Sequence, residues 1–220
     1  MYKYETHLHT FPASSCAKVP PQVCAPFYKA LGYDGIFVTN HFIHSSDDYE
    51  TQLNAYCADY EAVKAIGDEI GLKVFFGIEL TVAPGTDFLI YGLDKNWYLQ
   101  NRQIMDMPTR EKLSYMAQCG ALIVQAHPFR EAGYIDHIRL FPRNVHGVEV
   151  YNANRTELEN RMAGIYAENY GLLPFAGSDN HKGPAQTKLG GMAFSTPVRS
   201  EKDFADRIID GQGERFTLEL

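Results

Sequence analysis

Short apolar runs alternate with stretches of helical periodicity along most of this chain, and this alternation is the feature that most constrains its fold. Strands are expected at residues 2–7, 36–39, 73–78, 88–91, 121–124, 145–150 and 172–176. Helices are expected at residues 22–31, 48–70, 109–118, 155–170 and 201–209, with a last extended piece at residues 215–220. Most of the strands are continuous apolar runs, which is typical of parallel sheets buried on both faces.

We interpret the pattern as seven βα units and predict an α/β fold, a distorted (β/α)7 TIM-like barrel. An open doubly wound sheet is the alternative, but no glycine-rich phosphate loop follows the first predicted strand. A chain of 220 residues with 45% hydrophobic content can bury one sizeable core, and no linker divides it. Residues 1–220 are therefore expected to form a single domain.

Charge and composition exclude some classes of function. The 20 basic residues are scattered among 27 acidic ones, and the net charge of −7 argues against an extended nucleic-acid surface. No apolar run approaches the roughly 20 residues that cross a membrane, and the first residues do not read as a signal peptide. The four cysteines form no Cys-x-x-Cys pair, so reduced thiols and a cytoplasmic location are expected. The oligomeric state is not indicated.

Residue types that bind metal ions follow nearly every predicted strand. The carboxyl ends of parallel barrel strands meet at one face, where the sites of such barrels are built. Imidazole and carboxylate together suit zinc, manganese or iron. The sequence therefore predicts a centre of two to three divalent metal ions, for which the candidate ligands are His7, His9, His41, Glu79, Asp94, His127, Asp179 and His181.

The first two histidines illustrate the geometry behind this prediction. Side chains alternate faces along a strand, so His7 and His9 point the same way, about two rises of roughly 3.3 Å apart. Both imidazoles can then bind one ion. A single pair of this kind is equally explained by polar residues where a strand meets its loop. The number of similar strand ends further along the chain is what favours a metal site.

Five motifs occur in a fixed order along the chain: His-x-His at 7–9, Val-Thr-Asn-His-Phe at 38–42, Gly-Ile-Glu-Leu at 77–80, Ala-His-Pro-Phe at 126–129, and Gly-Ser-Asp-Asn-His at 177–181. In kind and order they resemble the motifs of PHP-domain phosphoesterases, the polymerase and histidinol phosphatase family. The resemblance covers almost the whole chain. It implies a distorted seven-stranded barrel that holds up to three divalent metals and hydrolyses phosphate esters.

The resemblance also implies a distribution of ligands. His7, His9, Glu79 and Asp179 would hold one ion, Glu79 would bridge to a second ion held by His127, and His41 with His181 would hold a third. Three positions depart from the family pattern. Ser14-Ser15-Cys16 stands where many members have Asp or His, and Asn40 replaces the usual Asp. Asp94 is the best match for a histidine expected after the fourth strand, although Asp87 at the start of that strand competes with it.

The function implied is hydrolysis of small phosphomonoesters of the nucleotide or sugar phosphate type by metal-bound hydroxide. Glu79 would lie beside the attacking water, and either His181 or the third metal would stabilise the leaving oxygen. Arg130, Asn152 and Arg155 are predicted to bind the phosphorylated substrate, since guanidinium groups bind phosphate in a bidentate manner. Both arginines have the simpler interpretation of solvated surface residues.

Two other functions stay open at this stage. One is a catalytically weak metal-binding module that senses a phosphorylated ligand, which Asn40 and Ser15 would suit. The other is a single-strand nuclease, which the acidic composition disfavours. Among the remaining histidines, His44, His137 and His146 are expected to face solvent, although His44 could line a pocket beside His41.

Overall fold

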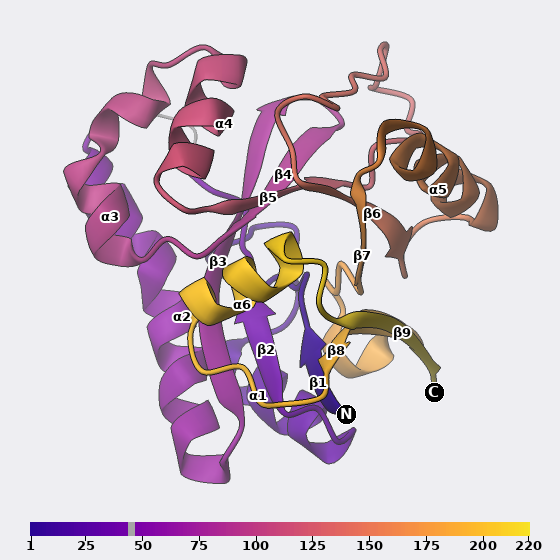
Figure 1. Cartoon of the computed structure of the whole chain (residues 1–220). Coiled ribbons are helices and arrows are strands. Elements are labelled where there is room, and N and C mark those ends of the chain that lie inside the picture. Colours follow the sequence, from indigo (N-terminus) through magenta and orange to yellow (C-terminus); the bar gives the residue numbers. More distant parts are fainter. Residues whose placement is uncertain (44–46) are drawn as a thin grey trace.

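The computed structural model describes residues 1–43 and 47–220, and it contains a single nine-stranded sheet in the order β7-β6-β5-β4-β3-β2-β1-β8-β9 (Figure 1). The strands are β1 (Tyr2–Glu5), β2 (Gly35–Val38), β3 (Lys73–Ala83), β4 (Thr86–Tyr91), β5 (Leu122–Ala126), β6 (Gly147–Asn152), β7 (Leu173–Gly177), β8 (Lys188–Phe194) and β9 (Glu214–Glu219). The α-helices are α1 (Pro21–Ala30), α2 (Tyr49–Ile70), α3 (Lys95–Gln100), α4 (Thr109–Gln118), α5 (Glu157–Tyr170) and α6 (Glu201–Ile209).

The sheet curves into a nearly closed barrel, which confirms the predicted α/β barrel fold (Figure 1). Strands β1, β2 and β3 are parallel to one another, and so are β5, β6 and β7. The expectation of seven equivalent βα units is wrong at β4, which is antiparallel to both β3 and β5. Gly85 takes a φ of +70° in the tight turn between β3 and β4, so these strands form a hairpin.

Backbone bonds beyond the ends of β1 and β7 close the barrel on one side. Leu8 and Asn180 form an isolated parallel bridge. The amide of His9 donates to the carbonyl of Asn180 over 3.0 Å, and the amide of Asn180 donates to the carbonyl of His7 over 3.2 Å. Leu8 lies between His7 and His9. The bridge that closes the barrel therefore also fixes the backbone positions of both histidines.

Strand β8 was not predicted from the sequence. It pairs antiparallel with both β1 and β9, and it contains Gly190 and Gly191, which favour a loop in sequence patterns. Close packing explains the glycines: a side-chain carbon on Gly190 would lie 2.7 Å from the ring of Tyr151, and one on Gly191 would clash with the carbonyl of Tyr4. The short helix α3 was also missed.

Aromatic rings fill the barrel interior. The Tyr91 ring on β4 contacts Phe37 on β2 and Phe175 on β7, strands that are not neighbours in the sheet. Phe204 of α6 packs against Phe37 with ring centroids 4.2 Å apart, so α6 adds to this interior cluster. The outer faces are covered by other helices, and α1 and α2 pack against each other and the neighbouring strands. None of the described helices has the length and apolarity to cross a bilayer.

Gly177 lies where β7 passes close to neighbouring side chains. A side-chain carbon at this position would lie 2.6 Å from Cβ of His7 and 2.7 Å from Oε1 of Glu149. We expect Gly177→Ala to lower the free energy of unfolding by about 1–3 kcal/mol, measured by chemical denaturation. The matched control is Gly164→Ala in α5, which meets nothing within 4 Å and should stabilise the helix. Equal effects of the two substitutions would contradict the packing described.

Candidate metal centre

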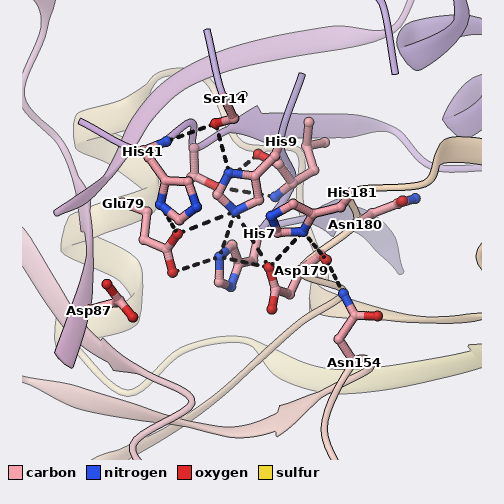
Figure 2. A network of polar contacts seen from close by, with 12 residues as sticks. His7, His9, Ser14, His41, Glu79, Asp87, Asn154, Asp179, Asn180 and His181 are labelled. Atoms are coloured by element: carbon pink, nitrogen blue, oxygen red, sulfur yellow. Dashed lines mark hydrogen bonds and ion pairs between the residues drawn. The ribbon is translucent and has the colours of Figure 1, made fainter. Parts of the chain in front are cut away.

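One end of the barrel gathers the ligand-type side chains that follow different strands (Figure 2). His7 and His9 come from the segment after β1, His41 from the segment after β2, and Glu79 from β3 itself. In the described part of the chain they form three groups with ligand atoms within 4.8 Å of one another, which are His7, His9 and Asp179, then His7, Glu79 and His127, and lastly His9, His41 and His181. Seven of the eight predicted ligands are therefore brought together.

The three groups differ in exposure. All members of the first two groups are buried. In the last group the side chains of His41 and His181 are 29% and 22% exposed. Glu79 lies between the groups, with Oε1 3.2 Å from Nε2 of His7 and Oε2 2.8 Å from Nδ1 of His41. A carboxylate in this position can contact two ions, in agreement with the bridging role that the family resemblance implies.

Hydrogen bonds to one ring nitrogen fix which nitrogen the histidines present to the site. Nδ1 of His7 lies 2.8 Å from Oε1 of the buried Glu149, and Nδ1 of His181 lies 2.9 Å from the backbone carbonyl of Asp179. An imidazole must donate to such acceptors, so Nε2 is the nitrogen that faces the site in both residues. Acceptors of this kind orient metal-binding histidines in proteins and raise their basicity.

Two positions that depart from the family pattern support the site. The Ser14 hydroxyl donates to Oδ1 of Asn40 over 2.8 Å, so it is available to accept from Nδ1 of His9 at 3.1 Å. The same oxygen accepts the backbone N–H of His41 over 3.0 Å. Asn40 also accepts the amide of Thr10 over 2.7 Å. Asn40 and Ser14 thus hold the segments that carry His9 and His41.

An unpaired buried carboxylate oxygen tests whether the site fits a metal ion. Oε2 of Glu79 has no hydrogen-bond partner among the described residues, although this side chain is 1% exposed. The same holds for Nδ1 of His41, even though the two atoms are 2.8 Å apart. Buried polar atoms without partners are costly, and these two atoms face the same space. A divalent cation between them would satisfy both, so the residues fit a metal.

The electrostatics also favour cations. Burial raises the pKa of the Glu79 carboxyl, but the charges of His7 and His41 outweigh burial and hold the pKa well below its usual range. Asp179 is likewise held ionised, since His7 and its hydrogen bonds to His181 and His9 outweigh burial. For His7, burial lowers the pKa, whereas Glu149, Asp179 and Glu79 raise it well above the usual value. This end of the barrel therefore stabilises positive charge.

Asp94 is the predicted ligand that the structure does not bring to the site. Because β4 is antiparallel to β3 and β5, its carboxyl end points away from the other strand ends. Asp94 caps α3 and accepts the backbone N–H of Trp97 over 2.8 Å. Asp87, at the start of β4, lies at the site instead, with Oδ2 3.9 Å from Nδ1 of His127. The prediction that Asp94 lies at the site is therefore wrong, and Asp87 is the one of the two aspartates that lies near His127.

The three residues predicted to bind substrate lie in different surroundings. The fully buried amide of Asn152 donates to Glu149 over 2.9 Å and to Asp179 over 3.2 Å, so it positions these carboxylates and is not accessible to substrate, which corrects the prediction. Arg155 lies 3.9 Å from Glu159 at the start of α5. Arg130 lines the pocket beside His41 and donates to the hydroxyl of Tyr134.

The remaining histidines differ in their exposure to solvent. His44 lies outside the described residues. His137 is exposed, as predicted. His146 is half-buried and its Nδ1 accepts the backbone N–H of Ile123 over 3.1 Å, so the expectation of a solvent-facing side chain is wrong there.

Sequence reasoning missed one residue that supports the site. Glu149 is a charged residue inside the apolar strand β6, and that contrast was the available signal. Its Oε2 accepts the backbone N–H of His127 over 3.0 Å, so this one carboxylate contacts two histidines. Cys16 lies in the loop where many members of the family have Asp or His, and it is exposed. Partial burial raises the pKa of its thiol, but hydrogen bonds to His181 and His41 outweigh burial and lower the pKa to about 6.

Comparison with known proteins gives one family match and several similar structures. A family model described as PHP-associated matches residues 157–212, which include α5 and α6. A two-domain protein from Bacteroides vulgatus ATCC 8482, containing a predicted PHP-like metal-dependent phosphoesterase, is 16% identical with a TM-score of 0.70. The match covers 98% of this chain and 64% of that one, so this chain spans less than two thirds of its length. No curated protein matches the sequence.

Two further structures share the fold. PsfC from Pseudomonas syringae PB-5123 is 17% identical with a TM-score of 0.64, and the match covers 100% of this chain and 91% of that one. An amidohydrolase from Chromobacterium violaceum with bound sulfate is 15% identical with a TM-score of 0.54, covering 95% of this chain and 97% of that one. At these identities the structures show a shared fold and not a shared reaction.

The fold and the site together define a class: an α/β barrel with a histidine and carboxylate cluster at one end, suited to divalent metal ions. Within that class the chain is similar to PHP-domain proteins in fold, in the order of its motifs and in its PHP-associated segment. The match of the PHP-associated model to residues 157–212 supports the resemblance found in the sequence.

Glu149 offers a test of the support around His7. Glu149→Gln keeps the shape of the side chain but removes the charge that the His7 imidazole contacts at 2.8 Å. We expect the affinity for divalent metal to fall about ten- to a hundredfold, measured by competition with a chromophoric chelator. The exposed Glu219→Gln on β9 is the control and should bind as the unmodified protein does. Unchanged affinity of Glu149→Gln would refute the role given to this carboxylate.

Proposed function

We propose that this protein is a metal-dependent hydrolase of phosphate esters, acting on small phosphomonoesters of the nucleotide or sugar phosphate type. The observation that carries the proposal is the convergence of seven imidazole and carboxylate side chains beside a pocket of about 780 Å³. That volume lies in the range of about 300–1,000 Å³ common for small-molecule sites. The likeness to a structure containing a predicted metal-dependent phosphoesterase supports the proposal.

The pocket combines the metal groups with surfaces for an organic substrate. His41 and Asp87 line it on the side of the metal centre. Phe42, Ile43, Tyr56 and Pro84 supply apolar wall, and Arg130 with Tyr134 supplies polar groups. The guanidinium of Arg130 lies 5.7 Å from the centroid of the Tyr134 ring, which orients the group that would bind phosphate. These features suit a compact ester better than a polymer.

The residues of the site divide the work of ester hydrolysis. Divalent ions bound there would neutralise the phosphoryl oxygens and make hydroxide available near neutral pH. Glu79, held ionised, orients the attacking water and keeps its position through contacts with His7 and His41. Burial lowers the pKa of His181, but its hydrogen bond to Asp179 outweighs burial and raises the pKa to about 10, so a protonated Nε2 could donate to the leaving oxygen. The acidic and basic groups are thus already oriented.

Turnover of phosphate esters tests this function. Protein loaded with manganese or zinc should hydrolyse p-nitrophenyl phosphate and members of a nucleotide and sugar phosphate panel. Glu79→Ala should lower kcat by at least about a hundredfold, because it removes a carboxylate that contacts both His7 and His41. Asp94→Ala, far from the site, is the matched carboxylate control and should keep full activity.

The same assay separates the alternatives. If metal-loaded protein is no more active than Glu79→Ala on every ester, the enzyme proposal fails and the phosphate-sensing module is favoured. Nucleotide release from single-stranded DNA together with inactivity on small esters would favour the nuclease.

Arg130 and Arg155 give a second test through substrate binding. Only Arg130 lines the described pocket, whereas Arg155 is near Glu159. Arg130→Gln should raise KM about tenfold or more, since a charge-assisted hydrogen bond contributes about 1.5–3 kcal/mol. Arg155→Gln should leave KM within about twofold of the unmodified value. Steady-state kinetics that show the opposite order would exclude Arg130 as the phosphate-binding residue.

A further inference from the structure

Asp59 on helix α2 is a buried carboxylate that does not belong to the three groups of candidate metal ligands. Its Oδ2 accepts the hydroxyl of Thr10 over 3.0 Å and the backbone N–H of Ala13 over 2.9 Å. These bonds compensate for the burial of the carboxylate. Thr10 and Ala13 belong to the segment that follows His9, so Asp59 ties this segment to α2.

The next link is a pair of hydrogen bonds between Thr10 and Asn40. The backbone N–H of Thr10 donates to Oδ1 of Asn40 over 2.7 Å, which orients the amide so that Nδ2 donates to the Thr10 hydroxyl over 2.8 Å. An amide nitrogen only donates, so the Thr10 oxygen accepts this bond and its own proton goes to Asp59. Asp59 is therefore the acceptor at the end of the chain of bonds.

The orientation of the same amide sets the direction of the bonds that lead to His9 (Figure 2). Oδ1 of Asn40 can only accept, so the Ser14 hydroxyl donates to it over 2.8 Å. The Ser14 oxygen is then left to accept, and it takes the N–H at Nδ1 of His9 over 3.1 Å. With its proton on Nδ1, His9 presents the lone pair of Nε2 to the metal centre.

The opposite arrangement shows why an acceptor is needed at the far end. If the Thr10 hydroxyl donated to Asn40 and not to Asp59, the amide would have to turn over, and its nitrogen would face the Thr10 N–H. Ser14 would then accept from the amide and donate to Nδ1 of His9, which would place the imidazole proton on Nε2. A nitrogen that carries a proton has no lone pair for a metal ion. By accepting the Thr10 proton, Asp59 favours the arrangement that leaves Nε2 of His9 for the metal.

We propose that Asp59 is a positioning residue of the metal centre, which keeps the imidazole proton of His9 on Nδ1 through the three side chains between them. Members of the resembling family usually have an aspartate at the position of Asn40. In this chain the carboxylate acceptor lies two hydrogen bonds beyond Asn40. The inference deepens the proposed function, since it rests on the same metal centre and assigns a residue that controls its assembly.

Magnetic resonance of zinc-loaded, isotope-labelled protein tests this role without turnover. The Nδ1 proton of His9 should give a low-field signal that exchanges slowly with water, because Ser14 accepts it. In Asp59→Ala this proton should exchange at least about tenfold faster, since local opening costs less free energy. The same variant should bind zinc about tenfold more weakly, measured by competition with a chromophoric chelator. Asp68→Ala, which changes an exposed aspartate paired with Lys64 on the same helix, is the matched control and should change neither quantity.

Asp59→Asn separates the acceptor role from general support of the fold. Both bonds to Asp59 end on one oxygen, which an amide oxygen can replace. This variant should therefore keep the slow exchange and bind zinc within about twofold of the unmodified protein. Circular dichroism reports whether each variant is folded.

The other outcomes overturn the proposal. Unchanged proton exchange and zinc affinity in Asp59→Ala would remove Asp59 from the metal centre, and Asp59→Asn as impaired as Asp59→Ala would show that an acceptor is not sufficient. Neither measurement uses an ester. If both variants behave as expected in a protein that hydrolyses no ester, Asp59 keeps its role and the proposed function fails. Ester hydrolysis together with an unaffected Asp59→Ala would do the reverse.

Discussion

The burial of several carboxylates at one end of the barrel is the constraint on which the rest of the structure depends. Glu79, Glu149 and Asp179 are almost completely removed from solvent, and ionised groups are costly there unless charges or hydrogen bonds compensate them. The histidines provide this compensation in the structure, and divalent ions would provide it more strongly. The closing bridge between Leu8 and Asn180 keeps these groups within reach of one another.

Much of the site could be predicted from the sequence. Side chains that follow parallel barrel strands meet at one end of the barrel, and applying this rule requires only the positions of the strands. His7, His41, His127 and Asp179 lie in separate parts of the chain, yet each follows a recognisable apolar run. Asp94 failed under the same rule because the direction of β4 is set by the hairpin turn at Gly85, which reverses which end of the strand reaches the site. Strand direction is a tertiary property, and apolar patterning does not contain it.

Other features of the structure could not be predicted from the sequence, because they depend on contacts between segments that are distant along the chain. Strand β8 contains two glycines because it passes close to Tyr4 and Tyr151, and neither neighbour is visible in the local pattern. Asn40 and Ser14 read as departures from the family, whereas the structure gives them a shared hydrogen bond that holds His9 and His41. A change of residue type at a site can thus preserve its geometry when the neighbours change as well.

The commitment of one ring nitrogen of His7 to Glu149 limits how the centre can fill. With Nδ1 occupied, His7 could serve a single ion through Nε2, and any neighbouring ion would have to be held through the carboxylate oxygens of Glu79. An ion bound to one of these oxygens would change the electrostatic potential at the position of the next ion. Uptake of more than one metal ion would therefore be a linked equilibrium, in which the affinity for each ion depends on the ions already bound.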